Sequence, residues 1–296
     1  MSEFNISSKI DLARALAVAP VEIEDVIQNR RRYYTNITVR KSNGGSRALR
    51  VPDGPLKLLQ DKVKRHILDQ LSPLDCVHGG VKGRSVLTNA KPHVGKRVLF
   101  TLDLKDFFPN VNQLTVRTIF QFFGFSGEAL DELARIATWD DQLPQGAATS
   151  VGLANWAMYR VDVRLCRLAQ QQGFAYTRYI DDLALSGGWR LLDFRRLVHR
   201  IVEQEEFRIN PAKVRTMLAG SRQIVTGVVV NRRLNVPREQ RDLIRGKVIQ
   251  LRSCGGRREN DIQSLRGHLA WFSSVNPQRA LRLQRVAFNT QELGRT

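Results

Sequence analysis

The sequence predicts an α+β fold organised around an antiparallel sheet, and three observations support this fold class. First, the β-prone runs 174–180 and 183–185 flank Asp181-Asp182, which predicts a β-hairpin with the acidic pair at its tip. Second, strand-like and helical segments alternate without the regular rhythm of a parallel βαβ sheet. Third, the chain after Pro237 has only helical patterns. Because a hairpin demands antiparallel neighbours, the α+β class is preferred over a parallel α/β sheet.

The elements expected in the first third of the chain lead to a short strand that carries a carboxylate. Residues 56–71 have apolar side chains at helical spacing, so one helix is expected there. In the strand 98–104, every second residue from Val98 to Leu104 is apolar, which places Asp103 on the opposite, non-core face. The segments expected before this strand are two short helices around Ala19-Pro20, a strand over 33–39, a turn over 43–46, a strand over 47–51 and a glycine-bearing loop over 77–85.

Helices dominate the elements expected after the Asp103 strand. One helix is expected over 112–123 and a second after Thr149 or Ser150, and each is followed by a glycine, Gly124 or Gly173, the residue most common at a helix C-terminus. The second helix has an apolar stripe made of Ala154, Met158, Val161, Leu165 and Leu168. The remaining expected elements are a helix over 191–204, a strand over 223–230, and helices over 237–251, 262–272 and 277–288.

The chain carries a strong positive charge that indicates a polyanionic partner. Its 47 Lys and Arg residues oppose 28 Asp and Glu residues, for a formal net charge of +19 and a pI near 10.7. Nucleic acid fits this balance better than a membrane surface does. Residues 26–52 hold seven basic residues and no acid, and residues 237–296 hold 12 basic and 5 acidic residues. This layout is typical of an enzyme that grips a phosphate backbone on both sides of a metal site.

The composition also predicts a cytoplasmic protein with no membrane partner. The cysteines Cys76, Cys166 and Cys254 are isolated, with no CxxC pair and no disulfide framework, which fits a reducing compartment. Polar residues interrupt the uncharged segment 142–159, so no membrane span is expected there. Acidic and polar residues also interrupt the first apolar segments, so no signal peptide is expected.

The acidic pair and Asp103 together predict one metal-binding cluster, because both strands carry carboxylates after an apolar approach. Three such charges a few ångströms apart repel by several kcal/mol, even at an effective dielectric of about 20. Divalent cations relieve this repulsion, and Mg²⁺ is usually held by a few carboxylates plus substrate phosphates. Two such ions, roughly 4 Å apart, stabilise the attacking and leaving oxygens of phosphoryl transfer. The pattern therefore predicts a nucleotidyl transferase.

The ordered motifs around these carboxylates resemble those of reverse transcriptases over nearly the whole chain. Residues 101–108 (TLDLKDFF) resemble the first palm motif, residues 143–150 (LPQGAATS) resemble the LPQG segment, and residues 179–182 (YIDD) resemble the YxDD box. The family fold is a right hand of fingers, palm and thumb. The resemblance implies fingers with N-terminal helices over 1–96, a palm over 97–235 with a fingers-side helical insertion at about 112–140, and a helical thumb over 236–296.

The same resemblance implies roles for residues at the reaction centre. It implies that Asp103, Asp181 and Asp182 are catalytic and bind two Mg²⁺ ions, which Mn²⁺ can replace, and that the backbone carbonyl of Leu104 is a further ligand. It also implies that Phe108 is the bulky gate that excludes a ribose 2′-OH. The residues implied to contact the incoming deoxynucleoside triphosphate are Lys41, Arg47, Asp106, Phe108, Gln145 and Lys213, the last in a later palm motif whose lysine can protonate pyrophosphate.

Two further boxes resemble a narrower group, the retron reverse transcriptases. Residues 89–93 (NAKPH) resemble their NAxxH box and residues 225–227 their VTG box, whereas Ile180 stands where many retron enzymes have Ala. This resemblance implies a cognate structured non-coding RNA, a branched RNA-linked single-stranded DNA product, and anti-phage defence with an effector protein. The residues expected to contact RNA are Asn89, His93, Arg241, Arg245, Lys247 and Arg252, the last four on a helix whose Leu243, Ile244, Val248 and Leu251 are expected to pack inward.

Other functions remain open from the sequence alone. The main alternative is another bacterial reverse transcriptase, from a group II intron or a diversity-generating element, although an intron enzyme is expected to carry further sequence after the thumb. An RNA-dependent RNA polymerase shares the palm chemistry, but the aromatic residues Phe108 and Tyr179 oppose it. A catalytically silent RNA-binding scaffold is a third alternative, and the intact aspartates argue against it.

Overall fold

A four-stranded antiparallel sheet lies at the centre of the computed structural model, which describes residues 4–40, 44–253 and 259–288. The strand order is β4 (Ala175–Tyr179), β5 (Asp182–Gly187), β3 (Val98–Asp103) and β6 (Arg215–Leu218). Strands β4 and β5 form the predicted hairpin around the acidic pair. Strand β6 is not among the predicted elements, since its four residues are mostly exposed and lack the alternation of a half-buried strand. The α+β class is confirmed.

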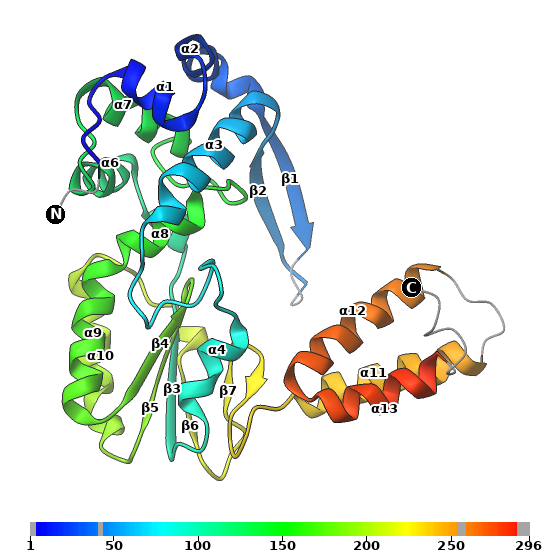
Figure 1. Cartoon of the computed structure of the whole chain (residues 1–296). Helices are drawn as coiled ribbons and strands as arrows, with labels where there is room; N and C mark the ends of the chain where they lie inside the picture. Colours follow the sequence, from blue (N-terminus) through cyan, green and yellow to red (C-terminus); the bar gives the residue numbers. More distant parts are fainter. Residues whose placement is uncertain (1–3, 41–43, 254–258, 289–296) are drawn as a thin grey trace.

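Two long helices cover one face of this sheet (Figure 1). Helix α9 (Tyr159–Gln172) packs against β4, and α10 (Leu191–Gln204) packs against β3. Gly173 ends α9 in the left-handed conformation with φ +68°, as the sequence predicts. The bounds of α10 are those predicted.

The other face of the sheet is covered by α4 (Val86–Ala90) and by a small hairpin of β7 (Ile224–Val225) and β8 (Val228–Val229) (Figure 1). These elements form a hydrophobic cluster with Leu99 and Ala184 of the sheet. The sheet is therefore buried on both faces around β3.

The helix expected after Thr149 is two helices, α8 (Ser150–Ala157) and α9, which meet at Met158. The predicted apolar stripe continues through this junction. All five of its residues are buried: Ala154, Met158, Val161, Leu165 and Leu168. The prediction of the buried face is confirmed, and the prediction of a single helix is wrong.

The region predicted to form the fingers consists of helices and a two-stranded ladder of β1 (Tyr34–Arg40) and β2 (Ser46–Pro52) (Figure 1). Helix α3 (Gly54–His66) ends five residues before the predicted position, and a 3₁₀ turn, η2 (Leu68–Gln70), follows it. The insertion predicted at about 112–140 contains two helices that pack, directly or through each other, on the N-terminal helices. The helices of this region are α1 (Lys9–Leu16), α2 (Pro20–Asn29), α3, α6 (Gln113–Phe122) and α7 (Gly127–Ala137).

The three C-terminal helices, in the region predicted to form the thumb, pack around their own small core and lie apart from the sheet on the side of β7 (Figure 1). They are α11 (Arg238–Ser253), α12 (Glu259–Val275) and α13 (Pro277–Ala287). By contrast, the fingers and the α9–α10 face of the sheet share one hydrophobic cluster. No helix among the described residues is long and apolar enough to cross a membrane. The remaining short helical elements are η1 (Arg30–Tyr33), η3 (Lys91–His93), α5 (Phe107–Asn110) and η4 (Pro211–Lys213).

Candidate active site

The three predicted catalytic aspartates meet at one end of the sheet. Asp103, the last residue of β3, is the cross-strand partner of Asp182, the first residue of β5. Asp181 lies in the tip between β4 and β5, and its carbonyl accepts a hydrogen bond of 3.1 Å from the Leu104 N–H. The sequence places Asp103 on the non-core face of β3, but this face is itself covered, so Asp103 is only 6% exposed.

The Asp103 carboxylate is held by the segment that follows α10. Its Oδ1 accepts from Nζ of Lys213 at 2.6 Å, and its Oδ2 accepts from the side chain of Asn210 at 3.4 Å. The Asn210 N–H also donates to the Asp103 carbonyl at 2.8 Å. Lys213 is 57% exposed, and its bond to Asp103 raises the pKa of its ammonium. The later palm motif therefore lies in direct contact with the first.

The carboxyl of Asp182 is crowded by the other two. The residue as a whole is exposed, but its carboxyl is partly withdrawn from water. This desolvation, followed by the charges of Asp181 and Asp103, raises the pKa of Asp182 to about 7. Like charges this close favour a bound cation.

The donor set fits a hard divalent ion, since it consists of carboxylate oxygens beside the Leu104 peptide. In the parts of the chain that the structure describes, no three His, Cys, Asp or Glu side chains already converge as a closed ligand set. Instead, the Asp103 carboxylate is paired with Lys213. The strand register thus brings the three aspartates together, while the Asp103 carboxylate forms an ion pair with the Lys213 ammonium.

The structure describes some of the predicted nucleotide contacts with their side chains and others in part or not at all. Asp106 is exposed, in the left-handed conformation with φ +50°, and precedes α5. Phe108 is half-buried and packs against Phe107 with ring centroids 5.6 Å apart. Lys41 lies outside the described residues, and Arg47 is placed by its backbone in β2, where it pairs with Val39.

Gln145 is the predicted nucleotide contact with the clearest structural signal. Its side-chain Oε1 is buried and has no hydrogen-bond partner. Gly146, the next residue, has φ +112° and lies close to β2, so that an added Cβ would come 3.1 Å from Val51 Cγ2. The LPQG segment therefore packs closely against β2, and the Gln145 Oε1 acceptor in this segment has no hydrogen-bond partner.

A cavity of about 590 Å³ adjoins the aspartates, and its lining includes basic side chains that the sequence pattern did not predict. Its lining includes Asp103, Asp182 and Lys213, and also two further basic residues, Arg215 and Arg222. Arg215 is the first residue of β6. Because the sequence pattern did not predict this strand, it also did not predict that Arg215 lies beside the aspartates.

The two retron-like boxes contact each other inside the protein. The side-chain amide of Asn89 donates to Thr226 Oγ1 at 2.7 Å. Thr226 and Gly227 both have positive φ and form the turn between β7 and β8, so the single strand predicted over 223–230 is wrong. Asn89 is fully buried. Its buried position does not support the direct RNA contact predicted for it.

His93 is also fully buried, between two hydroxyls of the sheet. Its Nδ1 lies 2.7 Å from Ser186 Oγ and its Nε2 lies 2.8 Å from Thr177 Oγ1. Burial, then the charges of His78 and Lys96, lowers the pKa of His93 to about 3. The predicted RNA contact is again unsupported, because no face of the ring reaches the surface.

The predicted RNA-contacting residues of α11 do not share one free face. Arg245 is exposed and pairs with Asp242 at 3.5 Å, whereas Lys247 donates to Ser264 of α12 at 2.7 Å. Arg241 is half-buried and Nε has no partner. The side chain of Arg252 lies outside the described residues. Of the residues expected to pack inward, Ile244 and Val248 are buried and Leu251 packs on the thumb core, but Leu243 is 50% exposed.

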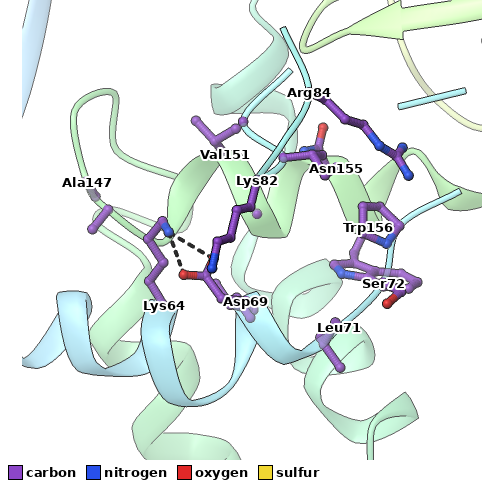
Figure 2. A pocket seen from close by; sticks show the side chains of 16 residues that line it. Lys64, Asp69, Leu71, Ser72, Lys82, Arg84, Ala147, Val151, Asn155 and Trp156 are labelled. Carbon is purple, nitrogen blue, oxygen red and sulfur yellow. Dashed lines mark hydrogen bonds and ion pairs between the residues drawn. The ribbon is translucent and has the colours of Figure 1, made fainter. Parts of the chain in front are cut away.

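A second cavity, of about 510 Å³, lies between α3, the loop 71–84 and α8 (Figure 2). Lys64 pairs with Asp69 on one side, and Asn155 and Trp156 of α8 lie on the other. None of the three aspartates lines it.

Comparison with known proteins identifies the family. The family model described as reverse transcriptase (RNA-dependent DNA polymerase) matches residues 39–252. Two retron reverse transcriptases of Myxococcus xanthus are similar: Mx65, 37% identical over 87% of this chain and 65% of its own, and Mx162, 34% identical over 83% and 58%. The retron Ec86 reverse transcriptase of Escherichia coli is 32% identical over 92% of this chain and 86% of its own. The chain thus spans less than two thirds of the two Myxococcus relatives. This chain belongs to the reverse transcriptase family and, within it, to the retron reverse transcriptases.

Proposed function

We propose that this chain synthesises DNA on an RNA template from deoxynucleoside triphosphates, with Asp103, Asp181 and Asp182 holding two Mg²⁺ ions that Mn²⁺ can replace. The observation that carries the proposal is the cross-strand pairing of Asp103 with Asp182, with Asp181 in the adjoining tip. The Leu104 N–H donates to the Asp181 carbonyl, which places Leu104 beside the cluster, and its own backbone carbonyl would be a further oxygen ligand. When bound, the ions lower the pKa of the primer hydroxyl and neutralise the triphosphate and leaving pyrophosphate.

The surrounding residues supply binding and selection. The buried Gln145 acceptor is suited to a donor of the incoming nucleotide, because a buried acceptor without a partner gains from one. Phe108 excludes a ribose 2′-OH by its bulk. Asp106 positions the triphosphate, and Lys41 and Arg47 of the fingers grip its oxygens.

Lys213 has two successive roles in this proposal. Without substrate, its ammonium neutralises Asp103 at 2.6 Å. During turnover it is released from Asp103 and protonates the leaving pyrophosphate. Its exposed side chain leaves it room to swing between the two.

The activity is tested by primer extension on an RNA template with each class of nucleotide. Extension with deoxynucleotides, abolished by Asp181→Asn while RNA binding persists, supports the proposal. Preferential use of ribonucleotides by the wild type points instead to an RNA-dependent RNA polymerase. RNA binding without any metal-dependent synthesis points to a silent scaffold.

We further propose that the template is a cognate structured non-coding RNA, that the product is single-stranded DNA joined to that RNA through a 2′-OH branch, and that the pair serves anti-phage defence with an effector protein. The support is the similarity to curated retron reverse transcriptases. The test is to express the native locus and isolate small nucleic acids. A discrete DNA that stays joined to RNA until a debranching enzyme is added supports the retron product. Its absence, with active extension on unrelated templates, points to an enzyme of the group II intron or diversity-generating kind.

A further inference from the structure

The tip of the catalytic hairpin has a backbone conformation that needs external support. Ile180, between Tyr179 and Asp181, has φ +59°. A β-branched residue rarely adopts this left-handed conformation, and such a conformation persists only where the surroundings enforce it. The groups that enforce it also determine where Asp181 and Asp182 point.

A buried guanidinium holds the carbonyl of this residue. Arg178, on β4, is fully buried, and its Nη1 donates to the Ile180 carbonyl at 2.8 Å and to Asn155 Oδ1 at 2.9 Å. Its Nε donates to Asp162 Oδ1 at 2.9 Å, and its Nη2 donates to Asp162 Oδ2 at 2.6 Å. The rigid fork of one side chain thus ties the hairpin tip to α8 through Asn155 and to α9 through Asp162.

A loop closes the outer side of the same tip. The Arg178 N–H donates to the Cys76 carbonyl at 2.7 Å, and the His78 N–H donates to the Arg178 carbonyl at 2.8 Å. Gly79 follows, and its carbonyl accepts from Asn155 Nδ2 at 2.9 Å. A Cβ added to Gly79 would lie 2.5 Å from the backbone nitrogen of Ile180. Only glycine allows this approach, so the loop and the guanidinium clamp the tip from two sides.

We infer that Arg178 and Asn155 are positioning residues, which hold the Ile180 carbonyl so that Asp181 and Asp182 are presented to the metal ions, and that Gly79 leaves the space this requires. The inference rests on the proposed function and deepens it, since it concerns the same site. It adds that the geometry of the carboxylates is set from behind the hairpin, by groups that touch neither substrate nor metal.

Three substitutions test the clamp, each with a different chemistry. Arg178→Lys keeps a positive charge opposite Asp162, but one ammonium cannot also reach the tip as the guanidinium does. Asn155→Ala removes the amide that joins Arg178 to Gly79. Gly79→Ala removes no polar group of the buried network and places a methyl group against Ile180 and the Tyr179 backbone.

Two matched controls separate positioning from general stability. Tyr176→Phe deletes the hydroxyl that donates to Asp162 at 2.7 Å, in the same buried network but away from the tip. Gly188→Ala adds a methyl group just beyond β5, where a Cβ meets nothing within 4 Å. All proteins are compared as full chains by thermal unfolding, by Mn²⁺ binding in electron paramagnetic resonance, and by kcat and KM in primer extension.

For the three test variants we expect an Mn²⁺ affinity lower by about tenfold and a kcat lower by about 100-fold. We expect KM for the primer–template to stay within about twofold of wild type, because Arg178, Asn155 and Gly79 are all buried. The controls should match wild type in both Mn²⁺ affinity and kcat. If Arg178→Lys does not fold, Gly79→Ala against Gly188→Ala decides.

Wild-type Mn²⁺ affinity and kcat in folded Gly79→Ala and Asn155→Ala would overturn the inference. So would losses that follow the unfolding temperature equally in all five variants, since these would reflect general destabilisation. Failure of the proposed function has a different signature, because the wild type itself would then neither bind Mn²⁺ at the aspartates nor extend a primer.

Discussion

The catalytic hairpin and the thumb hold their charged residues in opposite ways. Behind the hairpin, Arg178 and Asp162 are fully buried and bonded to partners on several elements. On α11, Arg245 is exposed and pairs with Asp242 of its own helix, at 3.5 Å. Buried charges fix a geometry because leaving one unpaired costs about 3–5 kcal/mol, whereas exposed pairs contribute about 1 kcal/mol or less. The charges behind the hairpin therefore fix one backbone arrangement, whereas the exposed ion pair on α11 constrains its helix little.

The largest expected effect is on the hairpin side, from Asp103→Asn. The change keeps the size of the side chain but removes a metal-binding charge worth several kcal/mol in the transition state, so synthesis should fall by about 10³-fold or more. RNA affinity and unfolding temperature should change little. Single-turnover extension measures synthesis, filter binding measures RNA affinity, and thermal unfolding measures the unfolding temperature. Undiminished synthesis would refute the metal assignment.

A smaller effect is expected from Phe108→Ala, which changes selection without touching the carboxylates. Removing the ring opens space for a 2′-OH, and discrimination against ribonucleotides should fall by about 10–100-fold. The ratio of kcat/KM for matched deoxy- and ribonucleotides measures it. An unchanged ratio would assign Phe108 to packing against Phe107 alone.

On the thumb side, reversing Arg241 and Arg245 to Glu should weaken RNA binding by about tenfold near 0.1 M salt and reduce the salt slope by about 1–2. Arg14→Glu, a charge reversal at an exposed arginine of α1, is the control. Affinity measured over a range of salt concentrations gives both quantities. A slope equal to that of the control would mean that Arg241 and Arg245 make no contact with RNA.

The smallest expected effect is a pH dependence of stability from His93. Its pKa is lowered to about 3 in the folded chain and is about 6.5 in the unfolded chain. Between these two pH values the ring binds a proton only in the unfolded chain. The contribution of neutral His93 to stability is therefore complete above pH 6.5 and is lost as the pH falls. From pH 7 to 5.5, wild type should lose about 1 kcal/mol more unfolding free energy than His93→Gln, as measured by urea titration. Parallel losses would show that the ring titrates freely.

The sequence predicted those features that depend on local pattern. The hairpin tip at Asp181-Asp182, the bounds of α10 and the end of α9 at Gly173 all follow from β-propensity, helical spacing and a glycine stop. Two apolar strands, each carrying carboxylates, predicted that Asp103 and the acidic pair lie in one cluster, and the observed register places Asp103 opposite Asp182.

The features that were missed depend on contacts between distant segments. Asn89 and Thr226 lie 137 positions apart and bond to each other, which no local pattern reveals. Nothing in the spacing around Arg178 distinguishes a buried guanidinium from a strand-edge charge. Leu243 was expected to be buried on helical spacing alone, but three thumb helices leave that flank of α11 uncovered.

The central claim, that the three aspartates hold two divalent ions for synthesis, is tested most directly by counting Mn²⁺ bound to the full chain by electron paramagnetic resonance. The complex contains an RNA template, a DNA primer lacking its 3′-OH, and the matching deoxynucleotide, so that no turnover occurs. We expect two ions per wild-type chain and fewer with Asp103→Asn at equal RNA occupancy. The same number of ions in both proteins would contradict the claim.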